Sequence, residues 1–176
     1  YGRRGAQSLP AGDVETLRRR KGLTTHETAT LRYDSREITN STTVIEFMLR
    51  IIPESEPETW LRKQNVIVDD LPTVAGTVLY HDEPRVHLPK SGVKLYRYTT
   101  SDAEGSREQL AYDPISLEGP INVVVKATVA ETVRQVEEIP VLQEGSGFTT
   151  TKYPTETLHE IITNAVIHRD YEVNDD

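Results

Sequence analysis

Three polar side chains that could act together on a nucleotide recur at steps of four near the end of the sequence. They are Glu160, Asn164 and His168. Residues four apart share one face of a helix, so a helix here would align a carboxylate, an amide and an imidazole. A carboxylate can deprotonate a water molecule, and an amide oxygen can bind Mg²⁺. Spacing alone favours a simpler interpretation, in which these are exposed polar positions on an ordinary amphipathic helix.

The residues around this trio predict the helix that must position it. Its apolar flank consists of Leu158, Ile161, Ile162, Ala165 and Val166. Pro154 stands where a proline is tolerated, near the first turn. We therefore expect a helix that begins near Pro154 and packs through its apolar flank, with Glu160 and Asn164 at the polar edge of the core.

The rest of the chain predicts a mixed α+β fold of short elements. Helical spacing of apolar residues predicts helices over 41–52, 54–64, 73–80 and 121–139. Alternation and β-branched residues predict strands over 65–70 and 92–99, and a hairpin that pairs 141–142 with 147–152. Leu71-Pro72 is expected to be a turn. The valines of 121–139 also favour a strand, but the length of the segment favours the helix.

Composition narrows the class of protein. The chain has 176 residues, a net charge of −8 and no cysteine. The absence of cysteine excludes disulfides and thiolate-bound zinc, and it fits a cytoplasmic location. No apolar run approaches the ~20 residues that cross a bilayer, so no membrane partner is expected. The chain begins at a tyrosine and stops shortly after the helix that carries Glu160, and we expect it to be a fragment of a longer protein.

Positive charge gathers at the beginning of the chain. Residues 1–50 hold nine Lys and Arg against six Asp and Glu, whereas residues 51–176 hold eleven against twenty-two. The basic residues that could contact nucleic-acid phosphates are Arg3, Arg4, Arg18, Arg19, Arg20 and Lys21. In the simpler interpretation, the run 18–21 lies in the last turn of a helix over 14–21, where cations offset the helix dipole.

Four histidines raise the question of a metal site. His81 and His87 are expected on a loop, and His159 and His168 on the last helix. Because no pair of carboxylates at ligand spacing completes a set, we interpret all four as scattered edge or solvent positions.

The triplet His168-Arg169-Asp170 also occurs in the catalytic loop of protein kinases. That loop requires a Leu after the Asp and an Asn seven residues after the His, whereas Tyr171 replaces the Leu, Asn174 follows His168 by six, and no Gly-rich loop or DFG motif follows. We favour the interpretation that His168 and Arg169 form hydrogen bonds and terminate the helix, with Asp170 anchoring the next turn.

The run from Glu160 to Tyr171 resembles a known motif. With Asn164-Ala165 and His168-Arg169-Asp170 in place, it is similar to the N-box that opens the GHKL, or Bergerat-fold, ATPases. With Tyr153-Pro154 it more closely resembles a bacterial and archaeal group of transcriptional regulators, described as ATP-binding, that join a Schlafen AlbA-type domain to a GHKL-like region.

Two further segments carry the same resemblance in the order of that family. The start, YGRRGAQSLPA, is similar to the strand near the end of the AlbA-type domain, and Leu71 to Pro84 is similar to the connecting segment. Tyr80-His81 stands where the family has Phe-Gly, so the turn there is expected to differ. The resemblance implies the end of an AlbA-type domain over 1–40, a mixed connecting region over 41–118 and the start of a GHKL-like ATPase domain over 119–176.

The resemblance also implies roles for the trio. Glu160 becomes the candidate general base, Asn164 the candidate Mg²⁺ ligand, and Asn164 with His168 the candidate contacts to ATP. The glycine-rich boxes that complete such a site would follow beyond Asp176, so the fragment alone is expected to lack ATPase activity. DNA or RNA and a second copy of the chain, in a homodimer, are the candidate partners. The alternatives are a non-catalytic dimerisation scaffold that retains the N-box for packing, and a subunit of a Schlafen-like nuclease.

Overall fold

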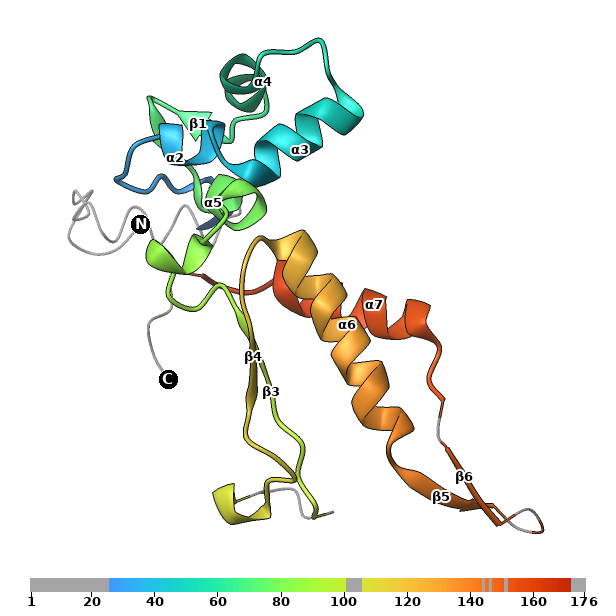
Figure 1. Ribbon diagram of the computed structural model, residues 1–176. Coiled ribbons are helices and arrows are strands. Elements are labelled where there is room, and N and C mark those ends of the chain that lie inside the picture. Colours follow the sequence, from blue (N-terminus) through green and yellow to red (C-terminus); the bar gives the residue numbers. More distant parts are fainter. Residues whose placement is uncertain (1–25, 101–105, 144, 146, 151, 172–176) are drawn as a thin grey trace, which may run out of the picture.

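The computed structural model describes residues 26–100, 106–143, 145, 147–150 and 152–171 (Figure 1). Over these residues the chain is a mixed α+β fold, as the sequence predicts. Its strands form three separate two-stranded antiparallel sheets within the described part. A cluster of short helices lies at one end, and a long helix, α6, leads away from it between a hairpin and the last helix (Figure 1).

The helices predicted over 41–52, 54–64, 73–80 and 121–139, and the one predicted to begin near Pro154, are all present, and the described residues form four shorter helices that carry no prediction. Their bounds are η1 His26–Thr28, α2 Arg36–Thr39, α3 Thr42–Ile51, α4 Pro57–Lys63, α5 Val74–Tyr80, η2 Pro84–Val86, η3 Arg107–Gln109, α6 Ile121–Glu137 and α7 Thr155–Ile167. The expected helix over 14–21 lies outside the described residues. The conflict over 121–139 is resolved in favour of helix, because one face of α6 buries Val124, Val125 and Val129 against its neighbours.

The strands are short, and one prediction about them is wrong. Their bounds are β1 Ile67–Val68, β2 Leu71–Pro72, β3 Val93–Leu95, β4 Ile115–Leu117, β5 Pro140–Gln143 and β6 Gly147–Thr150. Leu71-Pro72 is a strand that pairs with β1, not a turn. The turn is made by Asp69 and Asp70, whose φ angles of 49° and 63° suit a tight hairpin turn. The hairpin β5–β6 is confirmed.

Three clusters of buried apolar side chains hold these elements together. The first joins α2, α3 and α4 around Ile38, Val44 and Leu61. The second centres on Val74 and Val78 of α5 and draws in Ala29, Leu31, Ile121 and Tyr171. The third packs α6 on α7. The second cluster therefore unites residues from all three predicted domains, and the boundaries at 40 and 118 stay predictions.

No helix in the described part of the chain is both long enough and apolar enough to cross a membrane.

Candidate functional site

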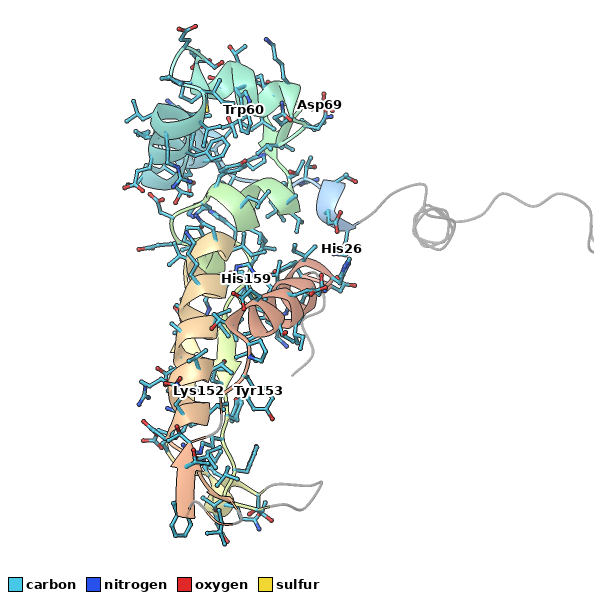
Figure 2. All side chains as sticks on the ribbon, turned by 90° about the vertical axis from the view of Figure 1, so that its right-hand side faces the viewer. His26, Trp60, Asp69, Lys152, Tyr153 and His159 are labelled. Atoms are coloured by element: carbon cyan, nitrogen blue, oxygen red, sulfur yellow. The ribbon has the colours of Figure 1, made fainter. Side chains whose placement is uncertain are left out.

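Helix α7, Thr155–Ile167, carries Glu160 and Asn164 of the trio singled out by its spacing, and His168 follows its last residue. Pro154 precedes the first turn, as predicted, and the helix ends at Ile167. Leu158, Ile162 and Val166 pack against Val125 and Val129 of α6. Figure 2 shows α7 crossing beside α6, with His159 labelled on it, next to Glu160 in the chain. The apolar contacts fix which side of α7 faces the rest of the molecule.

Glu160 and Asn164 lie on the opposite side of the helix from these contacts. A helix advances 3.6 residues per turn, so the two residues share a face turned away from Leu158 and Ile162. Both side chains are exposed. Neither forms a hydrogen bond or an ion pair with any described residue. Both side chains are therefore more exposed to solvent than we expected from the sequence, which placed them at the polar edge of the core.

His168 stands just past the end of the helix. It is the C-cap residue, its backbone N–H donates to the carbonyl oxygen of Asn164 over 3.0 Å, and its side chain is exposed. Its imidazole follows the amide of Asn164 along the chain without a bond between the two side chains. The structure thus brings Glu160 and Asn164 onto one accessible face and leaves His168 at its end.

The residue after His168 ties the end of α7 to two distant segments. The Arg169 side chain donates a hydrogen bond to the carbonyl oxygen of Gly92 over 2.8 Å. The Arg169 carbonyl accepts one from Nε2 of His26 over 2.9 Å, and Figure 2 labels His26 close to this end of α7. This agrees with the favoured interpretation, in which the His-Arg-Asp triplet ends a helix rather than forming a kinase loop.

A groove of about 900 Å³ lies against the other side of α7. Its walls come from α6, from the β3–β4 hairpin and from Leu158, Ile161 and Ile162 of α7. Glu160, Asn164 and His168 do not line it. Chemistry that depends on the trio must therefore take place on the exposed face of the helix and not in this groove.

The six basic residues proposed for phosphate contact fall outside the described residues. They are Arg3, Arg4, Arg18, Arg19, Arg20 and Lys21. Their role as a nucleic-acid surface stays a prediction.

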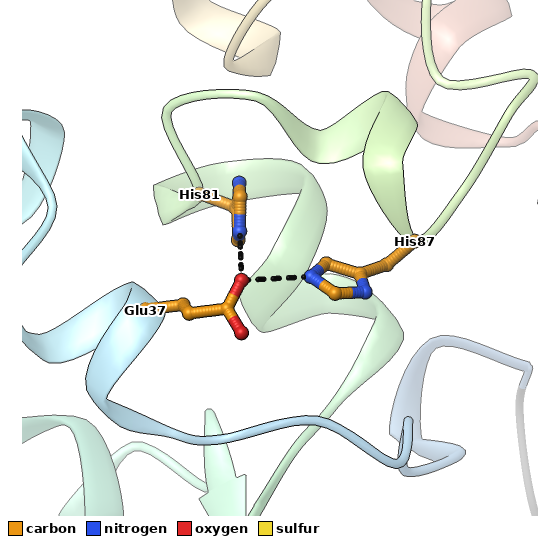
Figure 3. Close-up of side chains that lie close together, drawn as sticks. All are labelled: Glu37, His81 and His87. Carbon is orange, nitrogen blue, oxygen red and sulfur yellow. Dashed lines mark hydrogen bonds and ion pairs between the residues drawn. The ribbon is translucent and has the colours of Figure 1, made fainter.

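A second constellation, which sequence reasoning missed, lies in the helical cluster. Nε2 of His81 and Nε2 of His87 lie 3.3 Å and 3.0 Å from the same carboxylate oxygen of Glu37 (Figure 3). The interpretation of these two histidines as scattered is wrong, because the fold brings them together. The spacing His81-x₅-His87 was the available signal, but Glu37 precedes His81 by 44 residues and no spacing rule connects them.

The hydrogen bonds from the two imidazoles affect the carboxylate. The bond from His87 and then that from His81 lower the pKa of Glu37. A carboxylate held ionised between two ring nitrogens is a polar cluster built by tertiary contacts, because its members come from α2, from the end of α5 and from the end of η2.

Comparisons of the chain with protein families, with curated proteins and with solved structures find no match.

Proposed function

We propose that this chain is part of a nucleotide-dependent regulator in which α7 contributes to a Mg²⁺–ATP site. The observation that carries the proposal is the pairing of Glu160 and Asn164 on one exposed face of a well-anchored helix. The similarity of the surrounding residues to the N-box supplies the choice of nucleotide.

The donor set fits the group it would bind. Mg²⁺ prefers oxygen ligands and keeps several of its own waters, so one amide oxygen from Asn164 is a reasonable protein contribution. Glu160 is engaged by no described residue and is free to accept a proton from water. Bound Mg²⁺ would neutralise charge on the phosphates, and the exposed imidazole of His168 would lie at the end of the same face as a nucleotide contact.

Helix α7 is suited to hold such groups in place. The C-terminal end of α7, which bears Asn164, is held in two ways. Val166 is buried against α6, and the Arg169 side chain donates a hydrogen bond to the Gly92 carbonyl oxygen. Side chains mounted on an anchored helix are better oriented than side chains on a loop. The remaining contacts to a nucleotide would be made by residues outside this face of α7.

Variants of α7 test this proposal in the full-length protein. Glu160→Ala should lower ATP turnover by at least about 100-fold, the usual size of a general-base contribution, without weakening ATP binding. Asn164→Ala should weaken the Mg²⁺-dependent part of ATP binding. Glu156→Ala is the matched control, because Glu156 is an exposed carboxylate in the first turn of the same helix. Equal turnover by wild type, Glu160→Ala and Glu156→Ala would remove the role of Glu160.

The basic segment provides the second half of the proposal, contact with DNA or RNA. Anisotropy titrations with labelled duplex DNA and RNA would measure the affinity as salt is raised. Replacing Arg18, Arg19, Arg20 and Lys21 with alanine should weaken binding and flatten its salt dependence, since each lost phosphate contact reduces the slope by about one. Arg107→Ala is the control. Salt-independent binding, or none at low salt, would contradict this half.

A dimerisation scaffold is a second candidate, and the β5–β6 hairpin favours it. Leu142 and Phe148 are direct cross-strand partners and remain 71% and 77% exposed. Figure 1 shows this hairpin at the far end of α6, away from the helical cluster. A two-stranded hairpin is marginal in water without further packing, so an apolar pair on it is a reasonable contact for a second copy of the chain.

The oligomeric state distinguishes this candidate from the first. If the hairpin mediates self-association, Leu142→Thr with Phe148→Thr should convert a dimer into a monomer in sedimentation equilibrium, because threonine keeps the strand propensity and removes the apolar contact. Glu160→Ala should leave the mass unchanged. A wild-type monomer at high concentration would rule the scaffold out.

A further inference from the structure

The cluster of Glu37, His81 and His87 has the composition of a transition-metal site. One ligand atom from each residue can be chosen so that all three lie within 4.8 Å of one another. Zinc–ligand bonds of about 2.0–2.2 Å at tetrahedral angles place neighbouring ligand atoms about 3.3–3.5 Å apart. The two nitrogen–oxygen distances, 3.0 Å and 3.3 Å, are close to that spacing, so these donor atoms already lie near the separation of zinc ligands.

Aromatic packing holds the two imidazoles in these positions. The Tyr33 ring stacks on His87 with centroids 3.6 Å apart and planes 5° from parallel, and it meets the edge of His81 at 5.7 Å. The Tyr33 hydroxyl is itself bonded to Oγ1 of Thr77 over 2.8 Å. The ring orientations are therefore imposed by the fold before any ion arrives, which lowers the cost of organising a site.

The cluster is also open on one side. The His81 side chain is almost entirely buried, and that of His87 is 19% exposed, whereas the Glu37 side chain is 46% exposed. A site with three protein ligands and one side toward solvent leaves a position for water, as in zinc sites that bind or activate a fourth ligand.

The position of the proton on each imidazole ring determines which hydrogen bonds would break when a metal ion binds. The backbone N–H of Glu83 donates to Nδ1 of His81 over 2.9 Å, so the proton of that neutral ring lies on Nε2 and points at Glu37. An ion bound at Nε2 would require the proton to shift to Nδ1. The Glu83 amide would then lose its acceptor, while the partly exposed His87 could make the same shift toward water.

We propose that Glu37, His81 and His87 bind a divalent transition metal of the zinc class, with a water molecule in the fourth position. Two imidazole nitrogens and one carboxylate oxygen suit Zn²⁺ or Co²⁺ better than Mg²⁺ or Ca²⁺, which prefer oxygen. The site is separate from α7 and does not depend on the function proposed for it. Its binding-competent form is reached by breaking the Glu83–His81 bond.

Titration of the metal-free protein with Zn²⁺ alone tests this site. Isothermal titration calorimetry should show that the wild type binds one Zn²⁺ ion tightly. His87→Gln and Glu37→Gln should each weaken it by at least about 100-fold, more than a lost outer-shell contact would. His159→Gln, an exposed histidine on α7, should bind like the wild type. Co²⁺ should give the intense visible absorption of a four-coordinate site in the wild type and not in His87→Gln.

Two further readouts separate metal binding from a purely structural cluster. Zn²⁺ should raise the melting temperature of the wild type and leave that of His87→Gln unchanged, since only the wild type gains binding energy in the folded state. Hydrogen exchange at the Glu83 amide should accelerate when Zn²⁺ is added. No Zn²⁺ binding by the wild type, or equal binding by wild type and His87→Gln, would show that the three residues form only a hydrogen-bonded link between α2 and α5.

Discussion

The hydroxyl of Tyr171 donates a hydrogen bond to the carbonyl oxygen of Val166 over 2.7 Å. This carbonyl belongs to the last turn of α7, where backbone acceptors have no partner within the helix. The Tyr171 ring is buried in the second apolar cluster, together with Val74 and Val78 of α5. One side chain therefore caps the helix that carries Glu160 and Asn164 and fastens its end to the helical cluster.

Replacing Tyr171 by phenylalanine tests this cap. The ring stays in place, but the Val166 carbonyl loses its buried donor, so Tyr171→Phe should lower the free energy of unfolding by about 1–2 kcal/mol. Urea denaturation followed by circular dichroism would measure it. Tyr153→Phe is the control, because Tyr153 is 57% exposed before α7 and should change little. Equal midpoints for the two variants would contradict the cap.

Helix α5 is pressed against the backbone next to β1 at Gly76. A Cβ at this position would lie 2.6 Å from Cγ1 of Val66 and 2.7 Å from its carbonyl oxygen. Alanine normally favours a helix over glycine by about 1 kcal/mol, but here overpacking should dominate, and Gly76→Ala should destabilise the protein by about 1–3 kcal/mol. Thermal unfolding would show directly whether the substitution lowers or raises the melting temperature. A higher melting temperature for Gly76→Ala would mean that α5 does not approach Val66 so closely.

The first turn of α3 is capped from a distance. The Asp82 carboxylate accepts hydrogen bonds from the backbone N–H groups of Thr42 and Thr43 over 2.8 Å and 3.0 Å. The Ser41 hydroxyl accepts a hydrogen bond from the backbone N–H of Val44. Asp82→Ala should cost about 1–2 kcal/mol, as does the loss of a capping carboxylate at a positive helix end. Asp113→Ala, at an exposed position, is the comparison. Unfolding midpoints that coincide for both variants would refute the cap.

One contribution to stability in acid should come from the carboxylate of Glu131 in α6. Hydrogen bonds from Arg134 and then Gln135 lower the pKa of Glu131 to about 2, from an ordinary value of 4.5. A depressed folded-state pKa means that the unfolded chain binds the proton first, so this stabilisation is complete above about pH 4.5 and is lost as the pH falls toward 2.

Glu131→Gln should therefore flatten the fall in stability between about pH 4.5 and pH 2 relative to the wild type. Glu137→Gln, on the same helix at an exposed position, should keep the wild-type slope. Urea midpoints collected across this range would distinguish them, and parallel curves for all three proteins would argue against the lowered pKa.

Local patterns predict the five longer helices and the β5–β6 hairpin, but they miss the one-turn helices and misplace the strand at Leu71-Pro72. Ser41 and Thr73 cap α3 and α5 through their own hydroxyls, contacts within three residues that a sequence reveals. In contrast, a proline such as Pro72 suggests a turn. Pro72 instead lies in β2 as the cross-strand partner of Ile67, at a position where the pairing needs no backbone N–H from the proline. Strand β4 carries no prediction, because no alternation of apolar residues extends beyond its three residues.

The candidate sites differ in the same way. Glu160 and Asn164 are four residues apart on one helix, so their common face follows from helix geometry. The meeting of Glu37 with His81 and His87 depends on how α2 packs against α5, which no local spacing encodes. What sequence could not supply for α7 is its anchoring, since Arg169 reaches Gly92 across 77 residues of chain.

The most direct test of the central claim replaces Mg²⁺ by paramagnetic Mn²⁺ in the full-length protein labelled for NMR. With ATP present, the side-chain signals of Glu160 and Asn164 should broaden first, and Asn164→Ala should remove the effect. Any broadening around Glu37 without ATP would report the separate histidine cluster. ATP-dependent broadening that leaves the signals of Glu160 and Asn164 sharp would contradict a Mg²⁺–nucleotide site on α7.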